Sequence, residues 1–227
     1  MANLLAAALF FVGIHLFVSG TTLRDAIVQR TGEQAFLGLF SLASLGGIVW
    51  LCWAYGDATP HHLFAEVPAL RWLVLVLVFI AFQFAVIGLT TPSPTATGGE
   101  ARLDDEIAAV GILRITRHPF LWGVAIWALA HAIQNGEASA LVLFGALLVL
   151  ALVGPRSIDA KRARKFGDKW DRFATQTSNL PFAAIASGRN ELRLGELGWW
   201  RPAAATLAFA VFLGAHAWLF GVSPLPH

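Results

Sequence analysis

One histidine, His131, lies inside an apolar segment that follows a basic turn. Gly123, Trp127 and His131 are four residues apart, so they share one face of the expected helix. Lipid offers an imidazole no hydrogen-bond partner, and this side chain must therefore face the protein interior. An ionisable or metal-ligating group in such a place predicts a functional site around His131.

The turn before this helix carries further polar side chains. Arg114 and Arg117 lie at its mouth, and His118 and Pro119 stand at the helix start. The positive end of a helix disfavours an imidazolium ion, and the backbone there offers capping partners. We interpret His118 as a structural residue or as one at the edge of a substrate site, in preference to a metal ligand.

The composition indicates a protein of the lipid bilayer. Hydrophobic residues make up 57% of the 227-residue chain and charged residues 13%, with a mean hydropathy of +0.65. That is more apolar surface than one soluble core of this size buries. The single cysteine, Cys52, excludes an intramolecular disulfide and an all-thiolate metal cage, so nitrogen or oxygen would hold any cofactor.

The apolar segments predict an all-α fold, a polytopic membrane helical bundle of about six transmembrane helices within a single domain, 1–227. A span of the hydrocarbon core needs about 20 residues, and the fourth and fifth segments are short. The residues between these two, 134–137, form a turn signal that predicts an antiparallel helix hairpin. The six segments are 2–20, 35–55, 69–89, 119–134, 138–153 and 202–221.

The basic residues predict the orientation in the membrane. All lysines and arginines except Arg71 fall after the first, third and fifth segments. The positive-inside rule then assigns those loops to the cytoplasm and both termini to the outer side. The longest, 154–201, is expected to be a basic cytoplasmic loop whose run 161–165 touches anionic lipid, with no nucleic acid as partner.

Three histidines are expected at comparable depth. Counted from the inner face at 1.5 Å per residue, His15, His131 and His216 lie about 12, 18 and 21 Å along their helices. Two imidazoles from different helices suit the axial positions of a haem, and depth leaves open whether His131 pairs with His15 or His216. Each could instead make an interhelical hydrogen bond. Cations for the haem propionates would come from Arg24, Arg114 and Arg117.

An ordered set of motifs across nearly the whole chain resembles the NnrU family. The matching residues are His15 with Ser19 and Gly20, 23–25, 32–35, Gly111 and Ile112, 114–119, Gly123, Trp127, Ala130 with His131, 180–182, and Gly188 with Arg189. The resemblance implies a bacterial inner (cytoplasmic) membrane protein, multi-pass, associated with nitrite and nitric oxide metabolism in denitrification. It also implies haem b, whose two essential histidines fall on His15 and His131. No C-x-x-C-H motif is present for a covalent haem.

The resemblance implies an alternative activity as well. The family includes haem-dependent, redox-gated cis–trans isomerases of a polyene such as 15-cis-zeta-carotene. Both axial positions would then be filled in the oxidised protein, and loss of one ligand on reduction would expose the iron. A polyene would enter from the bilayer and lie against Trp127, Phe209 and Phe212.

A second alternative is an S-adenosylmethionine-dependent membrane methyltransferase. The stretch 117–123 resembles the RHPxYxG turn of isoprenylcysteine and phospholipid methyltransferases, although Leu121 stands where that motif has Tyr. The paired glutamates expected near the basic region are replaced by 158–161. We interpret the turn as shared ancestry without shared activity.

Overall fold

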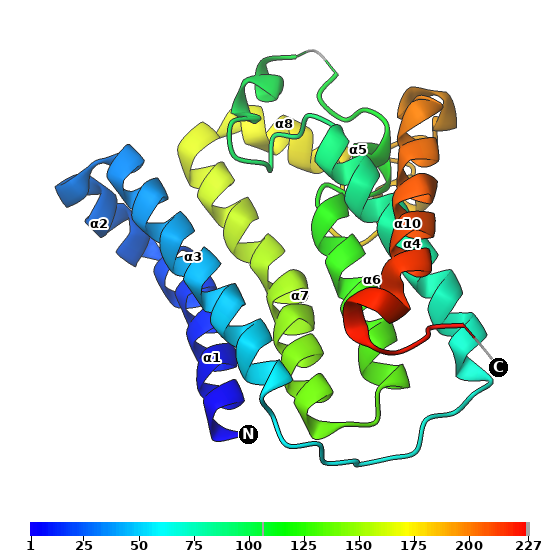
Figure 1. The fold of residues 1–227 in the computed structure, drawn as a ribbon. Coiled ribbons are helices and arrows are strands. Elements are labelled where there is room, and N and C mark those ends of the chain that lie inside the picture. The colour runs from blue at the N-terminus through cyan, green and yellow to red at the C-terminus, as the bar shows by residue number, and fades with distance from the viewer. Residues whose placement is uncertain (106, 226–227) are drawn as a thin grey trace. The chain divides into compact units, whose positions relative to one another are not determined.

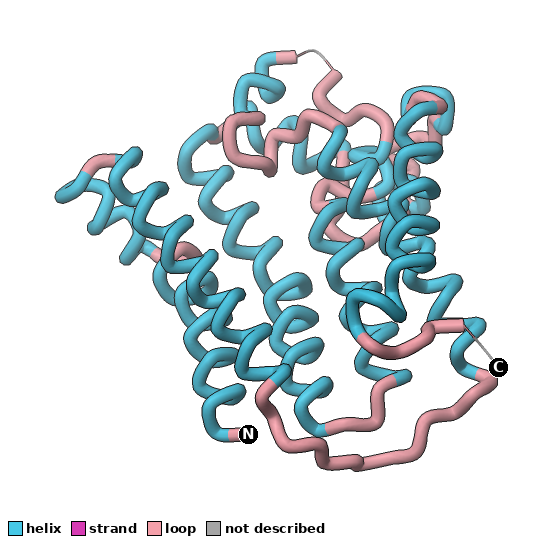
Figure 2. Tube along the Cα trace, in the orientation of Figure 1, coloured by secondary structure: helices cyan, strands magenta, loops and turns pink. Residues whose placement is uncertain are grey.

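The computed structural model describes residues 1–105 and 107–225, and in this part of the chain the ordered elements are helices without a strand (Figures 1 and 2). This confirms the all-α prediction. In chain order the elements are α1 (Ala2–Gly13), the π-helical turn η1 (Ile14–Val18), α2 (Thr22–Thr31), α3 (Glu33–Gly56), α4 (Leu70–Thr90), η2 (Glu100–Asp104), α5 (Ile112–Ile115), α6 (Pro119–Gln134), α7 (Ala138–Phe166), α8 (Asp168–Gln176), α9 (Ala183–Ala186), η3 (Leu194–Leu197) and α10 (Trp200–Phe220).

The chain is a multi-pass membrane protein. Among the described residues, α3, α4, α7 and α10 are long and apolar enough to cross a bilayer, and the bent pair Ala2–Val18 with Thr22–Thr31 is a fifth candidate. Each of the six predicted segments corresponds to a helix, the first to α1 together with η1, although α6 is only 16 residues long. The break between α6 and α7 falls at the predicted turn. The assignment of both termini to the outer side stays a prediction.

The helices form two compact units, each described below by itself. The first contains Met1–Val67 and Ala128–Ser157, and the second contains Pro68–Trp127 and Ile158–His227. Helices α6 and α7 contribute to both units. These units are defined by contacts within the chain. That the whole chain forms a single domain stays a prediction.

In the first unit α1 packs along α3 (Figure 1). The approach is close at Gly47, where a Cβ atom would lie 3.1 Å from the Phe10 ring and 3.2 Å from the Phe11 ring. Helix contacts in a bilayer depend on such small residues, because lipid leaves little hydrophobic driving force between helices. Further along, Tyr55 of α3 meets Phe144 of α7, with 6.4 Å between ring centroids.

The first span ends in a π-helical turn that contains His15. The amide of Ser19 donates to the carbonyl of Ile14, five residues back, at 3.0 Å. The axis then bends by 79° into α2. A Cβ atom at Gly20 would overlap the carbonyl oxygen of Leu16, so the bend needs glycine at this position. Single π turns are rare and occur often at functional sites.

Replacing Gly20 with alanine is expected to destabilise the protein by about 1–3 kcal/mol, because the π turn must open to make room for the new Cβ. Thermal unfolding in detergent measures the effect. Gly38→Ala is the matched control, since nothing lies within 4 Å of a Cβ at that position. Equal midpoints for the two variants would contradict a structural requirement for glycine at position 20.

In the second unit α4 packs against α10 and against the start of α6. A Cβ at Gly123 would lie 2.8 Å from the Ala81 carbonyl oxygen, and one at Gly88 would lie 2.8 Å from the Phe120 amide nitrogen. Glycine on both helices therefore brings the two backbones together. Between α4 and α10, the ring of Phe82 contacts Phe209 and Phe212, with centroids 5.8 and 5.7 Å apart.

The segment 154–201, expected to be a basic cytoplasmic loop, contains several helices. Helix α7 continues through Pro155 to Phe166, and α8, α9 and η3 follow. The continuation has a physical cause, because Ala163 and Phe166 pack against a buried cluster. The cluster consists of Leu103, Ala109, Leu113, Trp170 and Phe173. A run of good helix formers that gains an apolar contact extends the helix.

Candidate functional site

His15 is held on both of its ring nitrogens. Its Nδ1 lies 2.7 Å from the carbonyl oxygen of Phe11, and its Nε2 lies 3.2 Å from the hydroxyl oxygen of Ser44 on α3. A carbonyl oxygen only accepts hydrogen bonds, so Nδ1 must carry the proton. In the neutral ring Nε2 is then an acceptor, and the Ser44 hydroxyl donates to it. The Nε2 lone pair is therefore directed across the contact between α1 and α3.

A column of rings connects His15 to Arg24 within the first unit. The His15 ring lies 4.6 Å from that of Phe11 and 5.2 Å from that of Phe40, and Phe40 stacks on Phe36 at 5.7 Å. The guanidinium of Arg24 lies 5.3 Å above the centre of the Phe36 ring. Arg24 also pairs with Glu33 at 3.0 Å, so its charge is balanced.

His131 lies near the end of α6, three residues before Gln134, and belongs to the first unit like His15. Its ring packs on Phe144 of α7, with centroids 4.9 Å apart. The turn that follows is anchored, because the carbonyl of Gly136 accepts from the Leu63 amide at 2.8 Å. The hairpin therefore holds His131 against α7, in an aromatic setting that differs from that of His15.

His118 and Arg117 share one carboxylate in the second unit. His118 Nε2 lies 2.7 Å from one oxygen of Asp159, and an Arg117 nitrogen lies 3.7 Å from the other. The His118 side chain is 2% exposed. Burial lowers the pKa of the Arg117 guanidinium, and the charge of Asp159 offsets part of this effect. Both residues therefore form part of one cluster of charged side chains around Asp159.

Arg114 lies in a second buried cluster of the same unit. Its guanidinium makes two bonds to the Glu196 carboxylate, at 2.7 and 2.9 Å, and a third to Asn190 at 2.6 Å. The amide of Gly111, at φ +57°, also donates to Glu196. The Arg114 hydrogen bonds hold the pKa of Glu196 below its ordinary range. The Glu196 carboxylate therefore balances the positive charge of Arg114.

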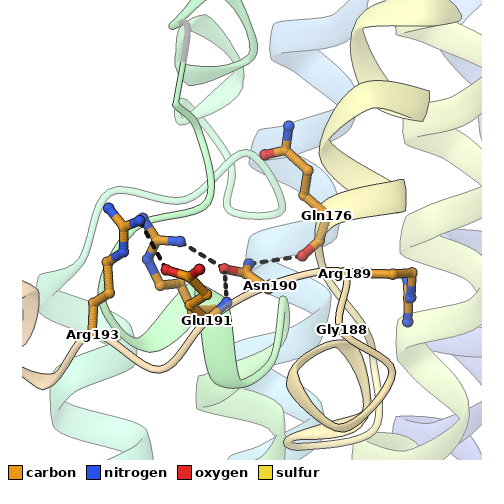
Figure 3. A pocket seen from close by; sticks show the side chains of 7 residues that line it. Gln176, Gly188, Arg189, Asn190, Glu191 and Arg193 are labelled. Atoms are coloured by element: carbon orange, nitrogen blue, oxygen red, sulfur yellow. Dashed lines mark hydrogen bonds and ion pairs between the residues drawn. The ribbon is translucent and has the colours of Figure 1, made fainter.

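A polar cavity of about 310 Å³ opens beside this cluster (Figure 3). In Figure 3 the side chain of Asn190 points into the middle of the group, and its amide donates to the Gln176 carbonyl at 2.8 Å. Arg193 pairs with Glu191 at 3.0 Å on the rim. The guanidinium of Arg189 donates to the carbonyls of Thr175 and Thr177, so the cavity walls are largely held by their own partners.

The remaining candidates, Trp127 and His216, also belong to the second unit. Trp127 is half-buried on α6. The Nδ1 of His216 lies 2.8 Å from the carbonyl of Val222, beyond the end of α10, and its ring meets Phe220 at 4.8 Å. The first unit thus contains His15, Arg24 and His131, and the second contains Arg114, Arg117, His118, Trp127 and His216.

Three residues of these clusters escaped the sequence reasoning, namely Ser44, Asp159 and Glu196. Ser44 is one of two serines in the apolar helix α3, the other being Ser41, and nothing in the sequence distinguishes it. Asp159 had been noted only as a replacement for a glutamate pair. Glu196 lies in the segment expected to be a basic loop, where a single carboxylate gives no sign of its buried partner.

The donor chemistry of His15 fits a haem iron. Histidines that bind a metal commonly donate the other ring N–H to a backbone carbonyl, which fixes the tautomer, and His15 has that arrangement. No group of three or more His, Cys, Asp or Glu side chains suited to a metal ion occurs among the described residues. A haem iron would need only two side-chain ligands from the protein, because the porphyrin supplies four nitrogens.

Comparison with known proteins identifies relatives over most of the chain. The chain is 29% identical over 193 residues to the chloroplastic 15-cis-zeta-carotene isomerase of Arabidopsis thaliana and 28% identical to that of Zea mays, which covers 83% of this chain and 52% of each relative. The chain spans about half the length of these curated relatives. No solved structure matches it. The profile of the family described as NnrU protein matches residues 3–224, and the chain therefore belongs to the NnrU family.

Proposed function

We propose that this protein is a membrane-embedded cis–trans isomerase of a conjugated polyene, with haem b held between His15 and His131. The observation that carries the isomerase proposal is the similarity to two 15-cis-zeta-carotene isomerases over 83% of the chain. The apolar setting suits this substrate class, because a long polyene dissolves in the bilayer and can reach the helices without crossing water.

The structure supports the choice of His15 and His131 as ligands in two ways. Both belong to the first compact unit, whereas His216 belongs to the second. Ser44, which His15 contacts, stands eleven residues into α3, and His131 stands twelve residues into α6. At 1.5 Å per residue these positions lie about 16 and 18 Å along the two helices, at comparable depth if both start at the cytoplasmic face.

The side chains of this site have separate tasks. His15 and His131 would hold the haem, which supplies an iron that changes oxidation state by one electron. Phe11 and Phe40 orient the His15 ring, and the Phe11 carbonyl keeps its proton on Nδ1. The aromatic rings around it exclude water from the metal-facing nitrogen. Arg24 lies at the polar end of the ring column, where it can meet a propionate at the cost of its pairing with Glu33.

A conversion assay tests the proposal. Purified protein in liposomes that contain 15-cis-zeta-carotene is expected to convert the cis double bond at carbon 15 to trans after reduction with dithionite, and to be inactive when oxidised. Chromatography of the extracted pigments measures the ratio of isomers. His131→Ala, prepared in parallel, is expected to be inactive in both states. Equal conversion by the wild type and this variant, or none by the reduced wild type, would overturn the proposal.

The other expectations stay predictions. An association with nitrite and nitric oxide metabolism would place the haem in a non-enzymatic role, and methyl transfer would use the turn at His118. A bacterial inner membrane is likewise a prediction, since the two plant relatives are named as chloroplastic. The isomerase proposal is preferred because named relatives support it.

A further inference from the structure

Ser44 contacts the ring nitrogen of His15 that is suited to a metal. Its hydroxyl oxygen lies 3.2 Å from Nε2, while Nδ1 is engaged by the Phe11 carbonyl. A hydroxyl in an apolar helix usually returns its hydrogen bond to a carbonyl of its own helix. Here it bonds across to another helix instead, at the nitrogen that the proposed function assigns to iron.

We infer that Ser44 is a positioning residue, and that its hydroxyl is the partner His15 takes whenever Nε2 is not bound to iron. This inference rests on the proposed function and on the loss of one axial ligand on reduction, which the family resemblance implies. It takes His15 as the departing ligand and Ser44 as the partner that its imidazole then keeps.

The surroundings of Ser44 make the exchange a small movement. Phe11 and Phe40 pack on the His15 ring, and the Phe11 carbonyl holds Nδ1, so the ring keeps its tautomer and its general direction. Gly47, about one turn beyond Ser44, keeps α1 and α3 close together. The hydroxyl therefore stays within reach of Nε2 without a movement of either helix.

The exchange is balanced in protons and electrons. When Nε2 is not bound to iron, its lone pair would accept a hydrogen bond from the Ser44 hydroxyl, and no proton would be transferred. The electron that precedes the exchange comes from a one-electron donor, for which dithionite serves in the experiment. A half-buried imidazole nitrogen left without a partner would be costly, and the hydroxyl lowers that cost.

The experiment compares carbon monoxide binding to dithionite-reduced protein. Ser44→Ala is expected to slow binding by roughly threefold to tenfold, because loss of one interhelical hydrogen bond favours the state in which His15 stays on the metal. The ferric spectrum should keep its form, and the midpoint potential should fall. Ser44→Thr retains the hydroxyl and should restore the rate. Ser41→Ala, an exposed serine on the same helix, is the control.

Each outcome has a distinct meaning. Equal rates for Ser44→Ala and Ser41→Ala in protein that contains haem overturn the role of Ser44 and leave the proposed function intact. A wild type without haem overturns the proposed function. In that case the ¹⁵N resonance of His15 Nε2 in labelled protein tests the hydrogen bond by itself. The inference then requires that Ser44→Ala shift this resonance and that Ser41→Ala leave it unchanged.

Discussion

Replacing either His15 or His131 with alanine is expected to abolish the six-coordinate low-spin ferric spectrum of the purified protein. The loss should be complete in each single variant, because a bis-histidine iron needs both nitrogens and a remote imidazole cannot reach the metal without moving a helix. Absorption spectra of the ferric and ferrous states measure the effect. Haem content, determined separately, distinguishes a lost ligand from a lost cofactor.

The matched controls are the other histidines within the helices or at their ends. His216→Ala should keep the spectrum, since His216 belongs to the second unit and His131 to the first. His118→Ala should weaken haem retention or shift the potential through its structural cluster, without a change in coordination. If His15→Ala kept the spectrum and His216→Ala lost it, His131 would pair with His216 and the assignment of His15 would be wrong.

Replacing Glu196 with glutamine is expected to cause a large loss of stability. The change leaves Arg114, 8% exposed, without its carboxylate partner, and breaking a buried ion pair costs about 3–5 kcal/mol. Glu196 is 29% exposed, so water can reach the site and we expect about 2–3 kcal/mol. The unfolding midpoint in detergent should fall by roughly 5–10 °C.

The same pair predicts a dependence on pH. Arg114 lowers the pKa of folded Glu196, so the pair stabilises the folded chain above the usual glutamate pKa of about 4.3. This stability is lost as the pH falls through the lower folded pKa. The gap between wild type and Glu196→Gln should therefore close in acid. Glu191→Gln, an exposed carboxylate of the same region, is the control, and equal midpoints for both variants would contradict the buried pair.

The helices and their order were predictable from the sequence because their signals are local. Apolar runs such as 69–89 and the turn at 134–137 require no knowledge of the partner segments. The extension of α7 to Phe166 could not be predicted from the sequence, since it depends on contact with Trp170 and its neighbours. The two compact units were also missed, because they divide α6 and α7 in their middle.

The candidate site was predictable only in part, for the same reason. An imidazole in an apolar segment stands out in a sequence, and His15 and His131 were found in this way. The π turn that carries His15 brings the Leu16 carbonyl so close to Gly20 that no Cβ fits there, which is a property of the folded backbone. Ser44 acquires its meaning only from the distance to Nε2, across 29 residues of sequence.

The most direct test of the central claim is the electron paramagnetic resonance spectrum of the purified wild-type protein, with its haem content determined in the same sample. Cells with an ample haem supply must be the source. The account predicts one non-covalent haem b per chain and a ferric signal of the low-spin, bis-histidine type. A colourless protein, or a haem whose ferric signal is high-spin, would contradict the claim that His15 and His131 hold the iron together.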